Sequence, residues 1–138
     1  MEQARFIGIP LKECINMADN RQHLGKTGER IASIFLKKNG YTFLTKNYRR
    51  KFGEIDIIAR KGDYLVFIEV KTRTGTSHGH PLEAVTVRKQ RQISKVAQCY
   101  LAENNLFDTA ARFDVVSVII SQKNTVNVEV VPNAFDIC

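Results

Sequence analysis

The sequence predicts an α/β domain in which one mixed five-stranded sheet is flanked by helices, in the order α-β-β-β-α-β-β. Two segments carry apolar residues at helical spacing, and five others are rich in β-branched and aromatic residues. The longer helix separates the third strand from the fourth, as a crossover helix does in a mixed sheet. With 138 residues, 43% of them hydrophobic, the chain is long enough for one domain with its own core.

The first part of the chain divides into a weakly patterned segment and a helix. Residues 1–21 carry scattered charges without periodicity, and we expect an N-terminal extension that is only partly ordered. Residues 22–138 then form a single domain. Apolar side chains recur at helical spacing over residues 29–39, and the helix they predict could begin near His23 and end at Gly40.

Three strands are predicted next. The segments 41–50, 53–60 and 64–73 are rich in β-branched and aromatic residues. Gly62 and Asp63 between the last two segments predict a two-residue type II′ turn, because glycine suits its first central position. This turn sets a register in which the numbers of opposite residues sum to 125.

The second half of the chain predicts a loop, a helix and two strands. Residues 74–81 read TGTSHGHP, a composition typical of an exposed loop, and an apolar stripe predicts a long helix over residues 82–104. The strongly apolar segment 112–121 predicts a central strand, and the alternating segment 125–131 predicts a strand near an edge.

The hairpin register brings two acidic residues together inside the predicted strands. Asp56 lies opposite Glu69, and Lys71 shares the face of Glu69 because side chains alternate along a strand. Two opposite carboxylates repel each other, and a divalent cation would turn that repulsion into coordination. One or two acids, with waters and substrate phosphate, describe a Mg²⁺ site, where Lys71 could stabilise phosphate charge. The alternative is that lysine and arginine side chains simply pair with solvated acids.

The same residues carry a family resemblance. Asp56 followed by Glu69-Val70-Lys71 matches the D…(E/D)xK pattern of the PD-(D/E)xK nuclease superfamily. The context "GEIDIIA…FIEVKTR", preceded by a helix with "GERIA", resembles the YraN-like family of bacterial proteins over about Leu24 to Val131. That family is similar to archaeal-type Holliday junction resolvases and restriction-endonuclease-like domains.

The resemblance implies a restriction-endonuclease-like fold and a role for each matching residue. Asp56, Glu69 and the main-chain carbonyl of Val70 would ligate Mg²⁺ or Mn²⁺, and Lys71 would assist a nucleophilic water. Glu29 on the first helix would complete the site or bind a second ion. On local grounds Glu29 is explained equally well as a favourable acid in a first helical turn. The implied activity is metal-assisted phosphodiester hydrolysis in DNA, including branched or structured DNA, by a monomer or a homodimer.

The formal net charge of +7 indicates an anionic partner, with nucleic acid ahead of an acidic membrane surface. Basic residues flank the predicted acid pair and open the second helix, where they could contact phosphates without reading sequence. The residues expected to bind nucleic acid are Arg49, Arg50, Lys51, Arg73, Lys89 and Arg91. The alternative for each of them is an ordinary solvated charge.

Other kinds of site find little support. The three cysteines are far apart and form no CxxC pair, which disfavours a disulfide framework and a cysteine zinc site. His78 and His80 on the loop lack a third ligand, and we expect Asp114 to form a strand-end salt bridge rather than assist catalysis. With no secretory signal or membrane-spanning run in the sequence, we expect a cytoplasmic protein without a membrane segment.

Three functions therefore compete. The first is a Mg²⁺- or Mn²⁺-dependent nuclease, and the second is a nucleic-acid-binding module with the nuclease fold but no physiological turnover. The third is an interaction protein whose acidic cluster is only salt-bridged. The matching acids and lysine favour the first over the second, and the charge of +7 favours either over the third.

Overall fold

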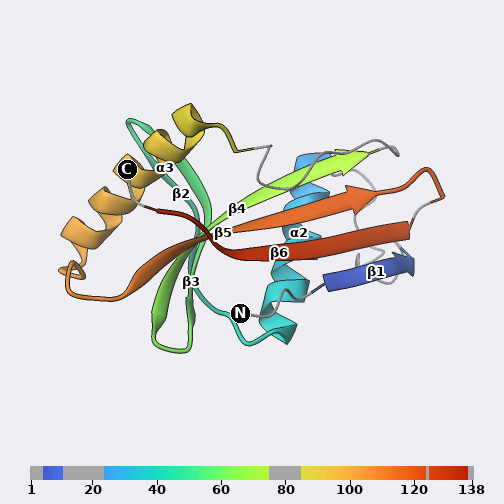
Figure 1. Cartoon of the computed structure of the whole chain (residues 1–138), viewed down its shortest axis with the longest axis horizontal. Coiled ribbons are helices and arrows are strands. Elements are labelled where there is room, and N and C mark those ends of the chain that lie inside the picture. Colours follow the sequence, from blue (N-terminus) through green and yellow to red (C-terminus); the bar gives the residue numbers. More distant parts are fainter. Residues whose placement is uncertain (1–4, 11–23, 75–84, 124, 137–138) are drawn as a thin grey trace.

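The fold is a mixed sheet with helices on both faces (Figure 1). The computed structural model describes residues 5–10, 24–74, 85–123 and 125–136. Within them the elements are β1 (Arg5–Pro10), α2 (Leu24–Lys38), β2 (Thr42–Arg50), β3 (Gly53–Lys61), β4 (Tyr64–Thr74), α3 (Val87–Glu103), β5 (Ala111–Ile120) and β6 (Thr125–Phe135).

From α2 onward the predicted order α-β-β-β-α-β-β is confirmed. The strands lie in the order β1-β6-β5-β4-β3-β2, and β4 and β5 are parallel while the other neighbouring pairs are antiparallel. The parallel pair requires a crossover, which α3 provides. β5, predicted to be central, lies inside the sheet, and β6 lies one strand from its edge.

The sheet has one strand more than the sequence predicts. Arg5–Pro10, assigned to the N-terminal extension, forms β1 and pairs antiparallel with β6. Six residues interrupted by Gly8 and Pro10 carry too little pattern to identify a strand, and β1 forms by adding to the otherwise open edge of β6. Residues 11–23 of the predicted extension lie outside the described residues.

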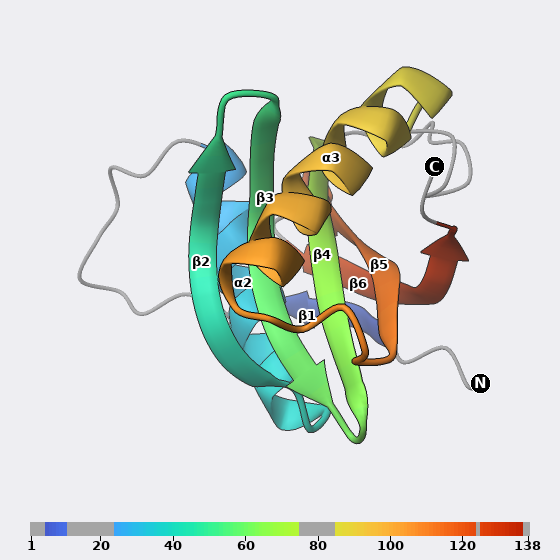
Figure 2. The same cartoon turned by 90° about the vertical axis from the view of Figure 1, so that its left-hand side faces the viewer.

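Each face of the sheet carries a separate core. α2 covers β4 and β5 from one side, whereas α3 packs against β3 and β2 on the other. Figure 2 shows α3 crossing in front of the strands with α2 behind them. Phe35 of α2 is fully buried against the sheet together with Ile57 and Ile68, and Phe67 and Phe113 are fully buried under α3.

The predicted hairpin register is confirmed. Ile57 lies opposite Ile68 and Lys61 opposite Tyr64, and Gly62 in the turn has a φ of +57° that favours glycine. The regular pairing of β3 and β4 ends at Ile57 and Ile68, so Asp56 lies where the two strands leave the ladder.

Helix α3 begins later than the sequence predicts. Its first residue is Val87, and Thr86 caps it by accepting a hydrogen bond from the Lys89 N–H at 3.1 Å. Val85 and Thr86, which the prediction assigned to the helix, precede it, because a threonine cap outweighs the apolar stripe as a start signal. The predicted loop 74–81 lies, after Thr74, outside the described residues.

Candidate acidic active site

Asp56 on β3 and Glu69 on β4 meet at the point where their strands separate. Asp56 Oδ2 accepts a hydrogen bond from the main-chain N–H of Val70 at 2.8 Å, so this carboxyl group is held against β4. The two carboxyl groups also influence each other's protonation. The structure thus brings together the two acids that the register placed opposite each other.

The acid pair is buried, and burial changes its protonation. Glu69 is only 6% exposed. Burial, followed by the charge of Asp56, raises the pKa of Glu69 to about 7, although Lys89 and Lys71 oppose the change. Burial also raises the pKa of Asp56, against the lowering effect of the Val70 hydrogen bond. Near neutral pH the two groups therefore carry fewer than two full negative charges.

Two lysines approach the same carboxylate oxygen. Nζ of Lys71 lies 3.6 Å from Oε1 of Glu69, and Nζ of Lys89 lies 3.8 Å from it. These distances are those of ion pairs rather than direct hydrogen bonds. Each lysine side chain is about one third exposed, at 34% and 35%, so each ammonium group also reaches solvent.

Lys89 lies closer to the acid pair than the sequence indicated. We expect it to contact substrate phosphates from the second helix, and the structure puts it beside Glu69, where that contact stays a prediction. Its position depends on the start of α3 at Thr86, three residues earlier. A threonine followed by a basic helical turn is the signal that could have located it.

Glu29 lies on α2, on the other side of the sheet, and is partly buried. A Cβ on Gly28 would lie 1.7 Å from Thr72 Oγ1, so α2 approaches the end of β4 as closely as glycine permits. Glu29 is thereby held near the strand end that carries Lys71. No acid occupies the first turn of α2, so the explanation of Glu29 as a first-turn acid is wrong.

The donor atoms at the acid pair suit a hard divalent cation. The carboxyl groups of Asp56 and Glu69 lie together where β3 and β4 separate. Mg²⁺ sites commonly use one or two carboxylates completed by waters and substrate phosphates. Within the described residues, no three His, Cys, Asp or Glu side chains gather as metal ligands, so Glu29 does not join the pair. Its catalytic role and the ligation by the Val70 carbonyl stay predictions.

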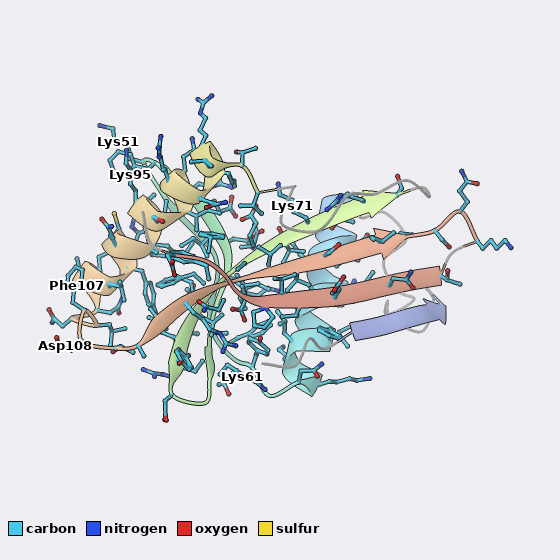
Figure 3. All side chains as sticks on the ribbon, viewed as in Figure 1. Lys51, Lys61, Lys71, Lys95, Phe107 and Asp108 are labelled. Carbon is cyan, nitrogen blue, oxygen red and sulfur yellow. The ribbon has the colours of Figure 1, made fainter. Side chains whose placement is uncertain are left out.

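The basic residues expected to bind nucleic acid differ in how far they are already engaged. Arg49 pairs with Glu54 at 2.9 Å, and the Arg50 guanidinium donates two hydrogen bonds of 2.7 Å to Glu103. Arg49 and Arg50 are nevertheless exposed, as are Lys51 and Arg91. In Figure 3, Lys51 and Lys95 project from the same side of the molecule, where α3 lies.

Arg73 is the basic residue with the most unusual surroundings. It follows Lys71 by two residues on β4 and is partly buried. Its Nε and Nη2 atoms are buried without a hydrogen-bond partner in the part of the chain that the structure describes. Such nitrogens are costly unless something pairs with them, and a phosphate is a matching partner.

The fold and the acid pair define an α/β protein with a candidate cation site at the open end of a β-hairpin. Residues 28–118 match the family model described as "Uncharacterised protein family UPF0102", and the chain belongs to this family. It is the family that the sequence resembles under the description YraN-like. The described residues hold no helix that is both long and apolar enough to cross a membrane.

Relatives from several organisms cover most of the chain. The UPF0102 protein of Dictyoglomus turgidum is 47% identical over 117 residues, which span 84% of this chain and 99% of the relative. That of Geotalea daltonii is 50% identical over 119 residues, spanning 86% and 93%. That of Caldicellulosiruptor saccharolyticus is 44% identical over 117 residues, spanning 84% and 99%. The names of these relatives state family membership and no activity.

Proposed function

We propose that this protein is a divalent-metal-dependent nuclease of the PD-(D/E)xK type that hydrolyses phosphodiester bonds in DNA. The observation that carries the proposal is the Asp56–Glu69 pair: Asp56 is half-buried and held against β4 by the Val70 N–H, and Glu69 is buried. Within the described residues, the cations that contact the pair are lysines at 3.6 and 3.8 Å, both from one oxygen of Glu69. A pair held in this way suits a cation better than a closed arginine salt bridge does.

The chain's own residues divide the work of the reaction. A bound Mg²⁺ or Mn²⁺ would supply Lewis-acid stabilisation of phosphoryl charge and a more acidic water. Asp56, fixed by the Val70 N–H, and Glu69 hold the cation, with the Val70 carbonyl as the proposed third ligand. Lys71, whose ammonium reaches both Glu69 and solvent, assists the nucleophilic water and offsets charge that develops on the phosphate. Glu29, which lies on α2 near the same end of β4, binds a second ion in this proposal.

DNA is the proposed partner because of the net positive charge of the chain and the positions of its basic side chains. The chain carries a formal charge of +7, and a basic surface of this kind attracts phosphates irrespective of base sequence. Arg73, two residues beyond Lys71 on β4, presents buried guanidinium nitrogens, and Lys51 and Arg91 are exposed. Arg49 and Arg50 contribute by exchanging a carboxylate partner for a phosphate.

Cleavage assays on linear, single-stranded, flapped and four-way DNA with Mg²⁺ or Mn²⁺ test the proposal. We expect the wild type to cut at least one of these substrates. Asp56→Asn and Lys71→Ala should each lower the rate about a hundredfold or more, while Lys71→Ala retains DNA affinity. Asp108→Asn, an exposed acid in the α3–β5 connection, serves as the matched control. Wild-type cleavage by Asp56→Asn would contradict the proposal.

A nucleic-acid-binding module without turnover is the second candidate. The observation that favours it is that no third carboxyl, imidazole or thiol group joins the two acids at the site within the described residues. This candidate predicts that the wild type binds the same DNA panel but cuts none of it, and that Asp56→Asn leaves affinity unchanged.

A further inference from the structure

The turn between β2 and β3 exposes an aromatic side chain among cations. Phe52 is 48% exposed, and it follows the exposed Lys51. The ammonium group of Lys95 on α3 lies over the Phe52 ring, 5.4 Å from its centroid. An aromatic ring at a turn, accompanied by basic side chains, is the arrangement with which proteins stack bases of single-stranded nucleic acid.

Other aromatic residues show why Phe52 stands apart. Tyr48, on the strand leading into the turn, is 8% exposed and packs edge-on against Tyr100, with ring centroids 5.3 Å apart. Tyr48 therefore belongs to the core and offers no face to a base. Phe107 is 65% exposed, but it is followed by Asp108, and no cation lies over its ring within the described residues.

Helix α3 connects the turn to the acid pair. Lys89, Gln92 and Lys95 are spaced three residues apart and form one row along the helix. Lys89 lies 3.8 Å from Glu69, and Lys95 lies over Phe52. Between them, the Cβ of Gln92 lies 4.0 Å from the position that a Cβ on Gly53 would take.

The row also sets a spacing. Six residues of α-helix between Lys89 and Lys95 rise about 9 Å along the helix axis, and the two side chains leave the helix about 120° apart, so 9 Å is the least separation between them. Stacked nucleotides rise about 3.4 Å each along one strand, so this length corresponds to about two to three nucleotides. A strand whose phosphate lies at Glu69 and Lys89 can therefore bring a base to Phe52 a few nucleotides away.

We propose that Phe52 is a stacking platform for an unpaired base, at least about two to three nucleotides from the phosphate at the acid pair. Lys51 and Lys95 contact the phosphates beside that base. An exposed cation–π contact is weaker than a base–aromatic stack, so the base displaces the Lys95 ammonium group from the ring and leaves it free for phosphate. The inference rests on the proposed nuclease function and narrows its substrate to DNA with single-stranded or splayed nucleotides next to the cleaved bond.

The test measures binding without divalent metal, so that cleavage plays no part. Fluorescence anisotropy compares a labelled single-stranded oligonucleotide with a blunt duplex of the same length, at one stated salt concentration. We expect Phe52→Ala and Phe52→Leu each to lose about tenfold in affinity for the single strand and less than about twofold for the duplex. Phe52→Trp should retain affinity for both, since it keeps an aromatic face.

The controls separate this inference from the proposed function. Phe107→Ala removes a more exposed phenylalanine that has no cation over its ring within the described residues, and it should leave both affinities unchanged. If the wild type binds neither DNA, the proposed DNA function is overturned. If the wild type binds both and Phe52→Leu binds the single strand equally well, only the Phe52 inference is overturned. Equal losses on single strand and duplex would also overturn it, because a base stack requires an unpaired base.

Discussion

Two buried acid centres lie on neighbouring strands, and their surroundings differ. Asp114 on β5 is fully buried and its carboxylate accepts hydrogen bonds from Arg112 (3.0 and 3.2 Å), Tyr41 (2.8 Å) and the Asn133 N–H (2.9 Å). Across the parallel register Asp114 is the partner of Ile68, one residue before Glu69. The acid pair of Asp56 and Glu69 instead has one main-chain donor and lysines at ion-pair distance.

The comparison shows that burial alone does not identify a functional acid. Donors surround the Asp114 carboxylate, so its charge is compensated inside the protein, as a structural role requires. At the acid pair one main-chain N–H donates to Asp56, and two lysines lie at ion-pair distance from one oxygen of Glu69. A pair of acids with so few donors is the centre with capacity left for a ligand.

The largest expected effect is the loss of stability when the Asp114 carboxylate is removed. Asp114→Ala should lower the free energy of unfolding by about 3–5 kcal/mol, because it leaves the buried Arg112 guanidinium without its carboxylate. Urea unfolding followed by circular dichroism measures the change. Asp108→Ala, which removes an exposed acid, should stay within about 0.5 kcal/mol. A loss below about 1 kcal/mol for Asp114→Ala would mean that its hydrogen bonds do not compensate the buried charge in the way argued.

The sequence predicted the positions of these centres better than their surroundings. Alternation and the Gly62-Asp63 turn sufficed to place Asp56 opposite Glu69, since the register of a two-residue hairpin is local. The expectation of a strand-end salt bridge for Asp114 is confirmed by its pairing with Arg112, two residues away. Both predictions involve residues whose relation is set within one strand or one hairpin.

Long-range contacts could not be predicted in this way. Tyr41 donates to Asp114 across 73 positions of sequence, and Lys89 reaches Glu69 only because α3 crosses over β3. β1 is held by pairing with β6 from the other end of the chain. Periodicity records which face of an element is apolar, but not which distant polar group lies above it.

A smaller effect, opposite in sign, is expected at the acid pair. Burial raises the pKa of Glu69 from 4.5 to about 7, so the folded state binds a proton that the unfolded state has released between these pH values. Glu69 therefore lowers stability as pH rises from about 4.5 to 7, and its full effect is present above pH 7. Glu69→Gln should raise the free energy of unfolding by about 1–3 kcal/mol at pH 8.

The pH dependence provides the control for this prediction. At pH 4.5 the wild-type carboxyl is largely protonated when folded, so Glu69→Gln and wild type should differ by less than about 1 kcal/mol. Urea unfolding at pH 4.5, 6 and 8 measures both proteins. If Glu69→Gln destabilises the protein equally at all three pH values, Glu69 acts through packing or ion pairs, and the contrast with Asp114 fails.

The smallest expected effect is the response to metal. If the acid pair binds a cation only when folded, Mg²⁺ or Mn²⁺ at ten times its dissociation constant should add about 1.4 kcal/mol to the free energy of unfolding. A rising thermal midpoint with increasing metal at pH 8 would measure this gain. Asp56→Asn should abolish it, because the amide cannot supply an anionic ligand, whereas Asp108→Asn should keep it. In the wild type the Asp114 carboxylate already accepts hydrogen bonds from the protein and does not hold the metal. Asp114→Ala should therefore keep the same metal-dependent gain, although its stability without metal is lower. If Asp114→Ala lost the metal-dependent gain in stability and Asp56→Asn kept it, the assignment of the two centres would be reversed.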